Sequence, residues 1–270
     1  MELSSESIQL IKNIIKNQKK FNYASLPNIS HFVECYDLYD YTPLEYFCSK
    51  NNETKVLEIL NTPNFLALDF EDYHPFQDCC KYLMINACKK MIQLDIVPKS
   101  IPIIEKCISY CFHSKMEEIA VFLFDKVAVQ TINPIYIKRN RINPLHYAIR
   151  NDLKIIIKYL FNYFEKFDMD NETNNNTFLI CCKYSNKEYI NKIIETKKEF
   201  IIPFLNNINN ETCVYWLLFY KNEDVLIKLF DVLEQSNKKS LINYLKKYLS
   251  YLSQNKLNKL IELVNKVNHE

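Results

Sequence analysis

Apolar residues recur at helical spacing on both sides of short polar breaks, and residues 142–161 show this pattern most clearly. Leu145, Ala148 and Ile149 lie three and four positions apart, which places them on one face of a helix. The polar pair Asn151-Asp152 interrupts the pattern, and a second apolar set follows in the stretch KIIIKYLF. Because both apolar runs are short, the pattern predicts two short helices joined by a tight turn.

This arrangement of two helices around a polar break occurs six times along the chain. The six segments begin at Tyr41, Tyr73, Glu105, Ile142, Asn176 and Thr212. A proline or a residue in its place marks the predicted start of each first helix, at Pro43, Pro75, Cys107, Pro144, Phe178 and Val214. Consecutive markers are 32, 32, 37, 34 and 36 residues apart. Self-similarity at such a period predicts a helical-repeat fold, and proline suits the first helical position because its N–H would be unbonded there.

The chain contains no glycine, so other residues must form its turns. Asparagine occurs in the breaks of four segments, at Asn51-Asn52, Asn151, Asn186 and Asn222. Because asparagine tolerates the left-handed backbone conformation, we predict that it forms these turns. The absence of glycine also excludes the standard forms of the phosphate loop, the dinucleotide fingerprint and the nucleophile elbow.

Two of the openings carry a family resemblance. Thr42-Pro43-Leu44 and Asn143-Pro144-Leu145-His146 resemble the Thr-Pro-Leu-His opening of ankyrin repeats, and the Leu/Ile-rich second helices add to it. The resemblance covers about residues 41–233 and implies an all-α, ankyrin-like helical-repeat solenoid of about six degenerate units. Tetratricopeptide repeats have a similar period, but their short turns and Gly/Ala/Pro pattern are missing. The long, proline-bearing connections favour the ankyrin plan, in which each connection forms a β-hairpin-like finger.

The segments outside the repeats are predicted to be helical caps. Residues 1–40 include one amphipathic helix at 5–19 and a connection to the repeats. Residues 234–270 include a final helix pair at 238–267, with Lys and Asn on its outer face. Terminal units with a polar outer face keep a repeat array soluble.

Composition and charge limit the partners, the cellular location and the kind of source genome that we expect. The net charge of +2 gives no reason to expect nucleic acid or a membrane as the main partner. Ten cysteines without zinc-ribbon spacing indicate reduced thiols in a cytoplasmic protein. The N-terminal stretch has no signal-peptide core, and the longest apolar run, 214–220, is far too short to span a membrane. Enrichment in Lys, Asn, Ile, Tyr and Phe without glycine indicates an AT-rich genome.

Few residues are candidates for metal binding or catalysis. Cys107, Cys111 and His113 form the densest set of metal-ligating types, but they lack a fourth ligand and the spacing of a tetrahedral site. The alternative is that the cysteines are small core residues, as Ala148 is in its own segment. His146 could be a catalytic base, although a structural hydrogen bond explains it better because no nucleophile accompanies it. Trp216 is expected to pack in the core rather than to bind a ligand. We expect no catalytic residue, metal or cofactor.

The remaining expectation is a non-enzymatic scaffold or adaptor that holds another protein. In proteins that this chain resembles, the partner lies in a concave groove lined by finger tips and first-helix ends. Carried over by position, the binding residues are Tyr41, Ser49, Lys50, Tyr73, Lys81, Tyr82, Arg150, Asn151, Asn176, Tyr184, Ser185, Tyr220 and Lys221. Tyrosine and basic residues are enriched in interfaces, although the chain has 19 tyrosines throughout. The alternatives are an RNA-binding helical-repeat protein and an enzyme with a non-standard Cys/His site.

Overall fold

The protein is predominantly α-helical. A computed structural model describes residues 4–17, 22–26, 29–32, 42–62, 74–127, 135–137, 140–167, 169–170, 175–197 and 213–232. The chain divides into two compact units, unit 1 (residues 1–141) and unit 2 (residues 142–270). In these ranges no helix is long and apolar enough to cross a membrane. The predicted cap at 234–270 lies outside the described residues.

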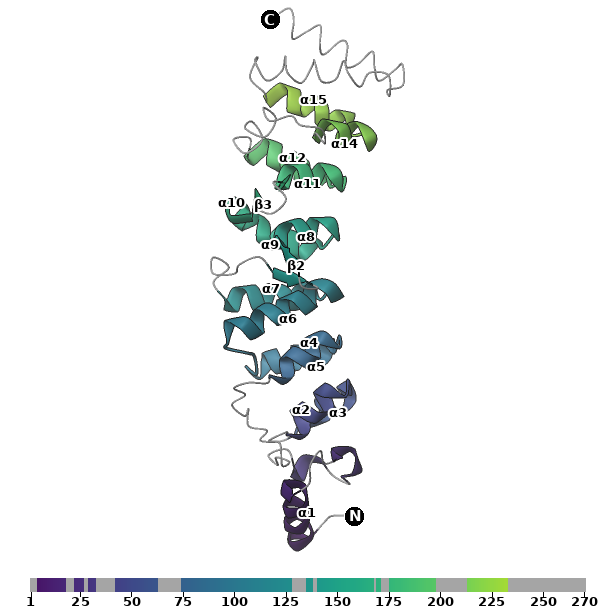
Figure 1. Ribbon diagram of the computed structural model, residues 1–270, viewed down its shortest axis with the longest axis vertical. Helices are drawn as coiled ribbons and strands as arrows, with labels where there is room; N and C mark the ends of the chain where they lie inside the picture. Colours follow the sequence, from purple (N-terminus) through teal and green to yellow (C-terminus); the bar gives the residue numbers. More distant parts are fainter. Residues whose placement is uncertain are drawn as a thin grey trace, which may run out of the picture. The chain divides into compact units, whose positions relative to one another are not determined.

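Unit 1 begins with α1 (Ser5–Asn17), which confirms the amphipathic helix predicted at the N-terminal side of the repeats. Two short 3-10 helices follow, η1 (Tyr23–Ser25) and η2 (Ile29–His31). Three helix pairs come next (Figure 1): α2 (Pro43–Ser49) with α3 (Glu53–Leu60), α4 (Pro75–Lys81) with α5 (Ile85–Gln93), and α6 (Ile101–Ser114) with α7 (Glu117–Lys126). Strands β1 (Ile135–Ile137) and β2 (Asn140–Ile142) form a two-stranded sheet where the two units join in sequence.

Unit 2 contains a further series of helix pairs (Figure 1). These are α8 (Pro144–Arg150) with α9 (Lys154–Leu160), α11 (Thr177–Lys183) with α12 (Lys187–Thr196), and α14 (Cys213–Phe219) with α15 (Glu223–Val232). Between the first two pairs lie η4 (Phe161–Tyr163), α10 (Phe164–Phe167) and the strands β3 (Met169–Asp170) and β4 (Asn175–Asn176). The strands pair antiparallel, with Met169 opposite Asn176. A short hairpin therefore leads directly into α11, as β2 leads into α8.

Neighbouring pairs pack helix by helix within each unit. In unit 1 the first helices α2, α4 and α6 contact one another in order, and the second helix α3 contacts α5. In unit 2 the first helices α8, α11 and α14 do the same, and α12 contacts α15. Each pair thus buries its apolar faces against its partner helix and its neighbours, since the amphipathic helices are too short to be stable alone.

Each first helix ends in the same kind of turn. The turn residue has a left-handed backbone, with φ between 54° and 64°, at Asn51, Leu83, Lys115, Asp152, Ser185 and Lys221. After α2, the Asn52 N–H donates to the Phe47 carbonyl at 3.0 Å and the Asn51 N–H donates to the Cys48 carbonyl at 3.1 Å, which is a Schellman motif. The prediction that asparagine supplies the left-handed residue holds at Asn51 and is wrong at the other three breaks with asparagine, where Asp152, Ser185 and Lys221 take this conformation.

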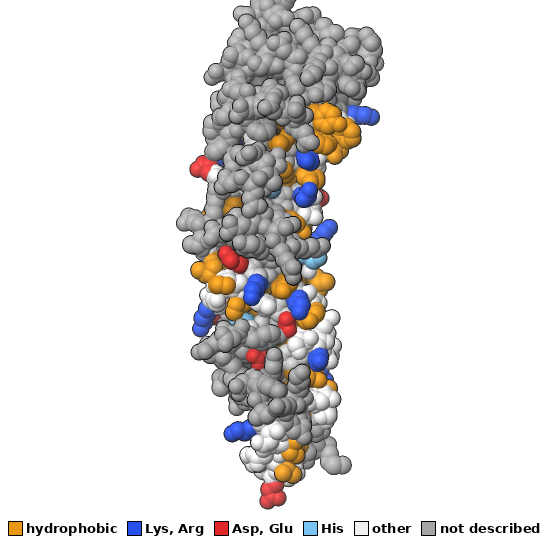
Figure 2. Space-filling view, in the orientation of Figure 1, with side chains coloured by type: hydrophobic (Ala, Val, Ile, Leu, Met, Phe, Trp, Pro, Cys, Tyr) orange, Lys and Arg blue, Asp and Glu red, His pale blue; other side chains and the backbone are white. Residues whose placement is uncertain are grey.

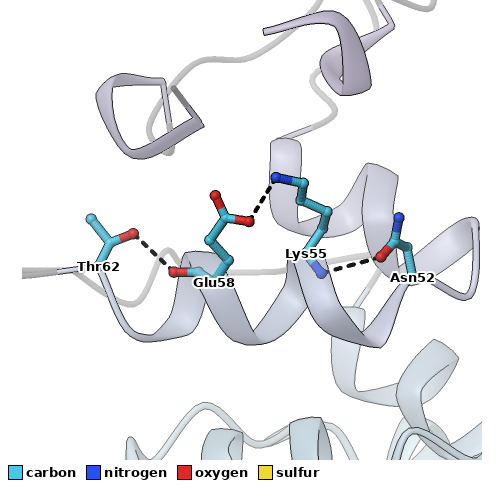
Figure 3. A network of polar contacts seen from close by, with 4 residues as sticks. All are labelled: Asn52, Lys55, Glu58 and Thr62. Carbon is cyan, nitrogen blue, oxygen red and sulfur yellow. Dashed lines mark hydrogen bonds and ion pairs between the residues drawn. The ribbon is translucent and has the colours of Figure 1, made fainter. Parts of the chain in front are cut away.

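Asparagine in the breaks has a different role. Asn52 is the N-cap of α3, and its Oδ1 accepts from the Lys55 N–H at 3.1 Å (Figure 3). Asn186 caps α12 in the same way, through the Tyr189 N–H at 3.4 Å. Asparagine is favoured here because its side-chain oxygen satisfies a helix N–H that has no partner within the helix. Asn52 and Asn186 therefore start the second helix, and the residue before each of them makes the left-handed turn, whereas Asn151 is the C-cap of α8 and precedes the left-handed Asp152.

The predicted starts of three first helices need correction. α11 begins at Thr177 and α14 at Cys213, one residue before the predicted Phe178 and Val214. The reason at α11 is its N-cap Asn176, whose Oδ1 accepts from the Leu179 N–H at 2.9 Å. α6 begins at Ile101, six residues before Cys107, with a proline in its first turn. The left-handed Lys115 that ends α6 follows the marker Cys107 at the same distance as Asn51 follows Pro43, so α6 is longer only at its N-terminal end.

A buried polar network joins the first two pairs of unit 2. The Asn143 side chain caps α8, and its Nδ2 donates to the Phe167 carbonyl at 2.8 Å. Thr177 Oγ1 donates to the same carbonyl at 3.2 Å and lies 3.0 Å from His146 Nε2. His146, the histidine of the Thr-Pro-Leu-His-like opening, therefore has a structural hydrogen bond to the next pair, as the sequence indicated. Buried polar groups are stable only when they are paired in this way.

Candidate interaction surface

The exposed C-terminal ends of the first helices form the candidate site. We use the name helix-end surface for the last two residues before each left-handed turn residue together with that turn residue. Most of these ends carry a basic residue, at Lys50, Lys81, His113, Arg150 and Lys183. A cation there is stabilised by the negative end of the helix dipole, which accounts for part of the pattern. The dipole does not account for the aromatic rings that accompany these cations.

In unit 1 the basic side chains lie over tyrosine rings. Lys50 Nζ lies 5.7 Å from the centre of the Tyr46 ring, and Lys81 Nζ lies 4.7 Å from the centre of the Tyr82 ring. A hydrogen bond with Tyr82 raises the pKa of Lys81, so the ammonium group stays charged. The Tyr46 hydroxyl donates to Asn22 Oδ1 at 3.0 Å, which fixes the ring against the N-terminal segment. These are cation–π pairs, each worth about 0.5–1 kcal/mol at an exposed site.

In unit 2 the pairs connect neighbouring first helices. Arg150 Nε of α8 donates to the Tyr184 hydroxyl at the end of α11 at 2.5 Å, and its guanidinium carbon lies 5.5 Å from the centre of that ring. Lys183 Nζ of α11 lies 5.6 Å from the centre of the Trp216 ring on α14. The Trp216 ring stacks on Tyr220, with centres 6.1 Å apart and planes at 22°. Cations and rings thus alternate across three adjacent helices.

α14 adds an exposed aromatic patch, which we define as Tyr215, Trp216, Phe219 and Tyr220. Tyr215 is 38% exposed, Phe219 59% and Tyr220 40%, while Trp216 is half-buried. Figure 2 shows exposed hydrophobic side chains gathered on the face where α14 lies. Trp216, which the sequence analysis expects to pack in the core, is only partly buried, because Cys213 and Leu217 take the fully buried side of α14. Tyr215, Trp216, Lys183 and Phe219 were not predicted as binding residues, although their spacing on one helix face and the preceding helix end could have indicated them.

The predicted binding residues fall into four groups. Lys50, Lys81, Tyr82, Arg150, Tyr184, Tyr220 and Lys221 lie on the helix-end surfaces, as predicted, and none of these is buried. Ser49, Asn151 and Ser185 also lie there but have hydrogen bonds within the protein: Ser49 and Asn151 donate to the Tyr46 and Tyr147 carbonyls of their own helices, and Ser185 accepts from Asn222 of the next pair. Asn176 does not lie on the surface, because the one-residue shift in register makes it a buried N-cap. Tyr41 and Tyr73 lie outside the described residues.

The second helices carry a contrasting set of charges. Their lysines form ion pairs with carboxylates of neighbouring elements: Lys89 with Glu118, Lys126 with Asp95, Lys187 with Asp224, Lys197 with Glu165 and Lys228 with Glu195, at 2.6–3.3 Å. The Lys187 ammonium lowers the pKa of Asp224 through a hydrogen bond. Each exposed pair contributes about 0–1 kcal/mol, so the pairs mainly neutralise that face. Two second-helix lysines also lie over rings, Lys126 at 5.5 Å from the centre of Phe122 and Lys192 at 4.3 Å from that of Phe161. The helix-end surface differs because cation–ring pairs recur there on successive first helices.

The cysteines that the structure describes form a buried set of thiols. All nine cysteines in the described ranges are free and buried. In unit 1, Cys48 Sγ lies 3.5 Å from Cys79 Sγ, and Cys80 Sγ lies 3.8 Å from Cys111 Sγ. His113 is exposed and points away from the buried Cys107 and Cys111, and no group of His, Cys, Asp and Glu in the described residues could hold a metal ion. Helices approach closely at these positions because cysteine is small and apolar.

The thiols are also poorly placed for catalysis. Burial raises the pKa of Cys80 and of Cys182, and hydrogen bonds with Cys48 and Cys88 raise the pKa of Cys79. The pKa of Cys88 is lowered to about 5 by hydrogen bonds from the two neighbouring thiols, but its side chain is fully buried. A reactive thiol must be both ionised and accessible, and none of these meets both conditions.

Comparison with known proteins gives no match to this chain among protein families, curated proteins or solved structures.

Proposed function

We propose that this protein is a non-enzymatic scaffold or adaptor that binds another protein across its helix-end surfaces. The proposal includes an ankyrin-like helical-repeat architecture over about residues 41–233. Three observations support that architecture: helix pairs follow one another at the predicted period, each first helix ends in the same left-handed turn, and a strand leads into α8 and α11. Fold alone does not imply function, so the functional argument comes from the surface.

The repeated pairing of cations with aromatic rings on exposed helix ends carries the proposal. Lys50, Lys81, Arg150 and Lys183 each lie within 6 Å of the centre of a tyrosine or tryptophan ring. Rings held by a cation or a neighbouring ring lose little conformational entropy when a partner binds. Such preorganised aromatic and basic groups are typical of the residues that dominate binding energy in protein interfaces.

The interior supports a binding protein rather than an enzyme. The described thiols are buried, and His146 is engaged with Thr177 between two helices. In the cytoplasmic location expected from the sequence, thiols such as Cys48 and Cys79 stay reduced.

Site-specific photo-crosslinking in the source cell tests the proposal. A photoreactive amino acid is placed at Ser49 or Phe219 on the helix-end surfaces, and at the exposed second-helix positions Glu58 or Lys158 as matched controls. We expect protein adducts at the first two positions and few at the controls. Equal adducts at all four positions, or adducts that contain only RNA, would refute the proposal.

A further inference from the structure

The chemistry of the helix-end surface of unit 2 indicates what kind of partner it binds. Among the described side chains of residues 213–220, those that are not buried are all aromatic: Tyr215, Trp216, Phe219 and Tyr220. The equivalent positions of α2 and α4 carry Glu45, Tyr46, Ser49 and Lys50, and Gln77, Asp78, Lys81 and Tyr82. The fold does not require these rings, because other first helices of the chain form the same turn without them. An exposed apolar cluster of this kind marks an interaction site.

Arg150 supplies the charged part of the surface. Its Nε donates to the Tyr184 hydroxyl, which holds the guanidinium over the surface at the end of α8. The other N–H groups of Arg150 have no hydrogen-bond partner among the described residues, and they form a planar donor set that matches a carboxylate. Lys221, the exposed turn residue after α14, adds a second cation. On the ends of the three first helices, Asp152 is the one exposed carboxylate in the described residues.

The charges and rings of this surface favour a protein segment over a second copy of the chain or a nucleic acid. A second copy of this chain bound through the same surface would bring Arg150 and Lys221 against identical cations, which is unfavourable. Nucleic acid would need open ring faces for base stacking. Here Tyr215 stacks on Phe219, with ring centres 6.0 Å apart and planes at 27°, and Trp216 stacks on Tyr220. The exposed rings present a continuous apolar surface with flanking cations, which fits apolar and acidic side chains of a protein.

We infer that the helix-end surface of unit 2 binds a protein segment in which carboxylate side chains accompany apolar ones. The apolar side chains pack on the aromatic patch, and the carboxylates pair with Arg150 and Lys221. Neighbouring helices lie about 8–10 Å apart, so an extended segment of about six residues reaches from α14 to α8. This inference rests on the proposed function, because it names the partner chemistry of the same surface.

Selection from a random dodecamer peptide display library on the full chain tests the inference. The wild type is compared with Arg150→Glu/Lys221→Glu and with the control Lys154→Glu/Lys158→Glu, which changes the charge equally on α9. We expect peptides rich in Asp or Glu together with Leu, Phe or Trp to be enriched on the wild type and the control. On the Arg150→Glu/Lys221→Glu variant, binding of these peptides should fall about tenfold or more. Helical content measured by circular dichroism confirms that all variants are folded.

A second pair of variants tests the aromatic patch. Phe219→Ala should weaken the selected peptides about tenfold, whereas Ile155→Ala, a similarly exposed residue of α9, should leave binding unchanged. Arg150→Lys, which keeps the charge but loses the planar donor set, should bind with intermediate affinity.

The inference is overturned if no peptide is enriched, if enriched peptides lack acidic residues, or if charge reversal leaves their binding unchanged. It is also overturned if single-stranded RNA binds and competes at the same residues. In each case the photo-crosslinking result stands separately: protein adducts at Ser49 and Phe219 would retain the proposed function, and their absence would remove both.

Discussion

His74 makes the stability of unit 1 depend on pH. It is the N-cap of α4, its Nδ1 accepts from the Phe76 N–H at 3.3 Å, and only 6% of the residue is exposed. Burial lowers the pKa of His74 from 6.5 to about 4, and a hydrogen bond with the Val97 backbone only partly opposes this shift. The folded protein therefore holds the imidazole neutral.

The sign of the effect follows from proton uptake. Above pH 6.5 the imidazole is neutral in both states, and the stabilisation is fully present. As the pH falls from 6.5 to 4, the unfolded chain takes up a proton at His74 and the folded chain does not, so the free energy of unfolding decreases. The pKa difference corresponds to a loss of about 3 kcal/mol when the pH reaches 4.

The test compares urea unfolding of wild type and His74→Thr, followed by circular dichroism from pH 7.5 to pH 4. Threonine at this position, with Gln77 three residues later, can form the capping box that Thr42 forms with Glu45 in α2. The variant should lose about 3 kcal/mol less than wild type over this range, because all other titrating groups are the same. His113→Asn, which removes an exposed histidine, is the control and should follow wild type. Equal pH dependence of wild type and His74→Thr would refute the reasoning.

Three further predictions concern the turns, the buried network and the thiols. Lys115→Gly should raise the free energy of unfolding by about 0.5–1 kcal/mol, because Lys115 has a φ of 57°, which glycine adopts without strain. Lys50→Gly should lower the free energy of unfolding, because Lys50 has a φ of −91°. Urea denaturation measures both values, and the reverse order would contradict the role of the left-handed turn. Thr177→Val should destabilise the protein by about 1–3 kcal/mol because it removes the hydroxyl that contacts His146, and Thr177→Ser, which keeps the hydroxyl, should cost clearly less. The nine buried cysteines should react with iodoacetamide only after unfolding, as measured by peptide mass spectrometry, and rapid labelling of any one of them in the native protein would revive the enzyme alternative.

Helix pairs with strong local signals were predictable from the sequence. Pro43, Pro75 and Pro144 each begin a helix as predicted, because proline fits the first helical position and excludes the residue before it from the helix. At α11 no proline marks the start, and the choice between Asn176 and Thr177 as N-cap depends on one hydrogen bond to the Leu179 N–H. Both residues are suitable caps, so the sequence alone left the register open by one position.

The candidate site was predictable only in part. Positional reasoning placed Lys50, Lys81, Arg150 and Tyr184 on exposed helix ends, because the repeat fixes where each first helix ends. It could not show that Arg150 bonds to Tyr184, since these residues are 34 positions apart and meet only when α8 packs on α11. For the same reason it missed Lys183 and assigned Trp216 to the core.

The sequence by itself determined the alternation of helices and turns, because apolar periodicity, proline and asparagine act over a few neighbouring residues. It also determined that the turns are made without glycine. Tertiary structure decided which residues take the left-handed conformation, because the Schellman turn is placed by the burial of both helices it joins, even where that puts Leu83 or Lys115 at positive φ. It also decided which rings and cations meet, since those contacts join helices of different pairs and depend on packing between elements far apart in the chain.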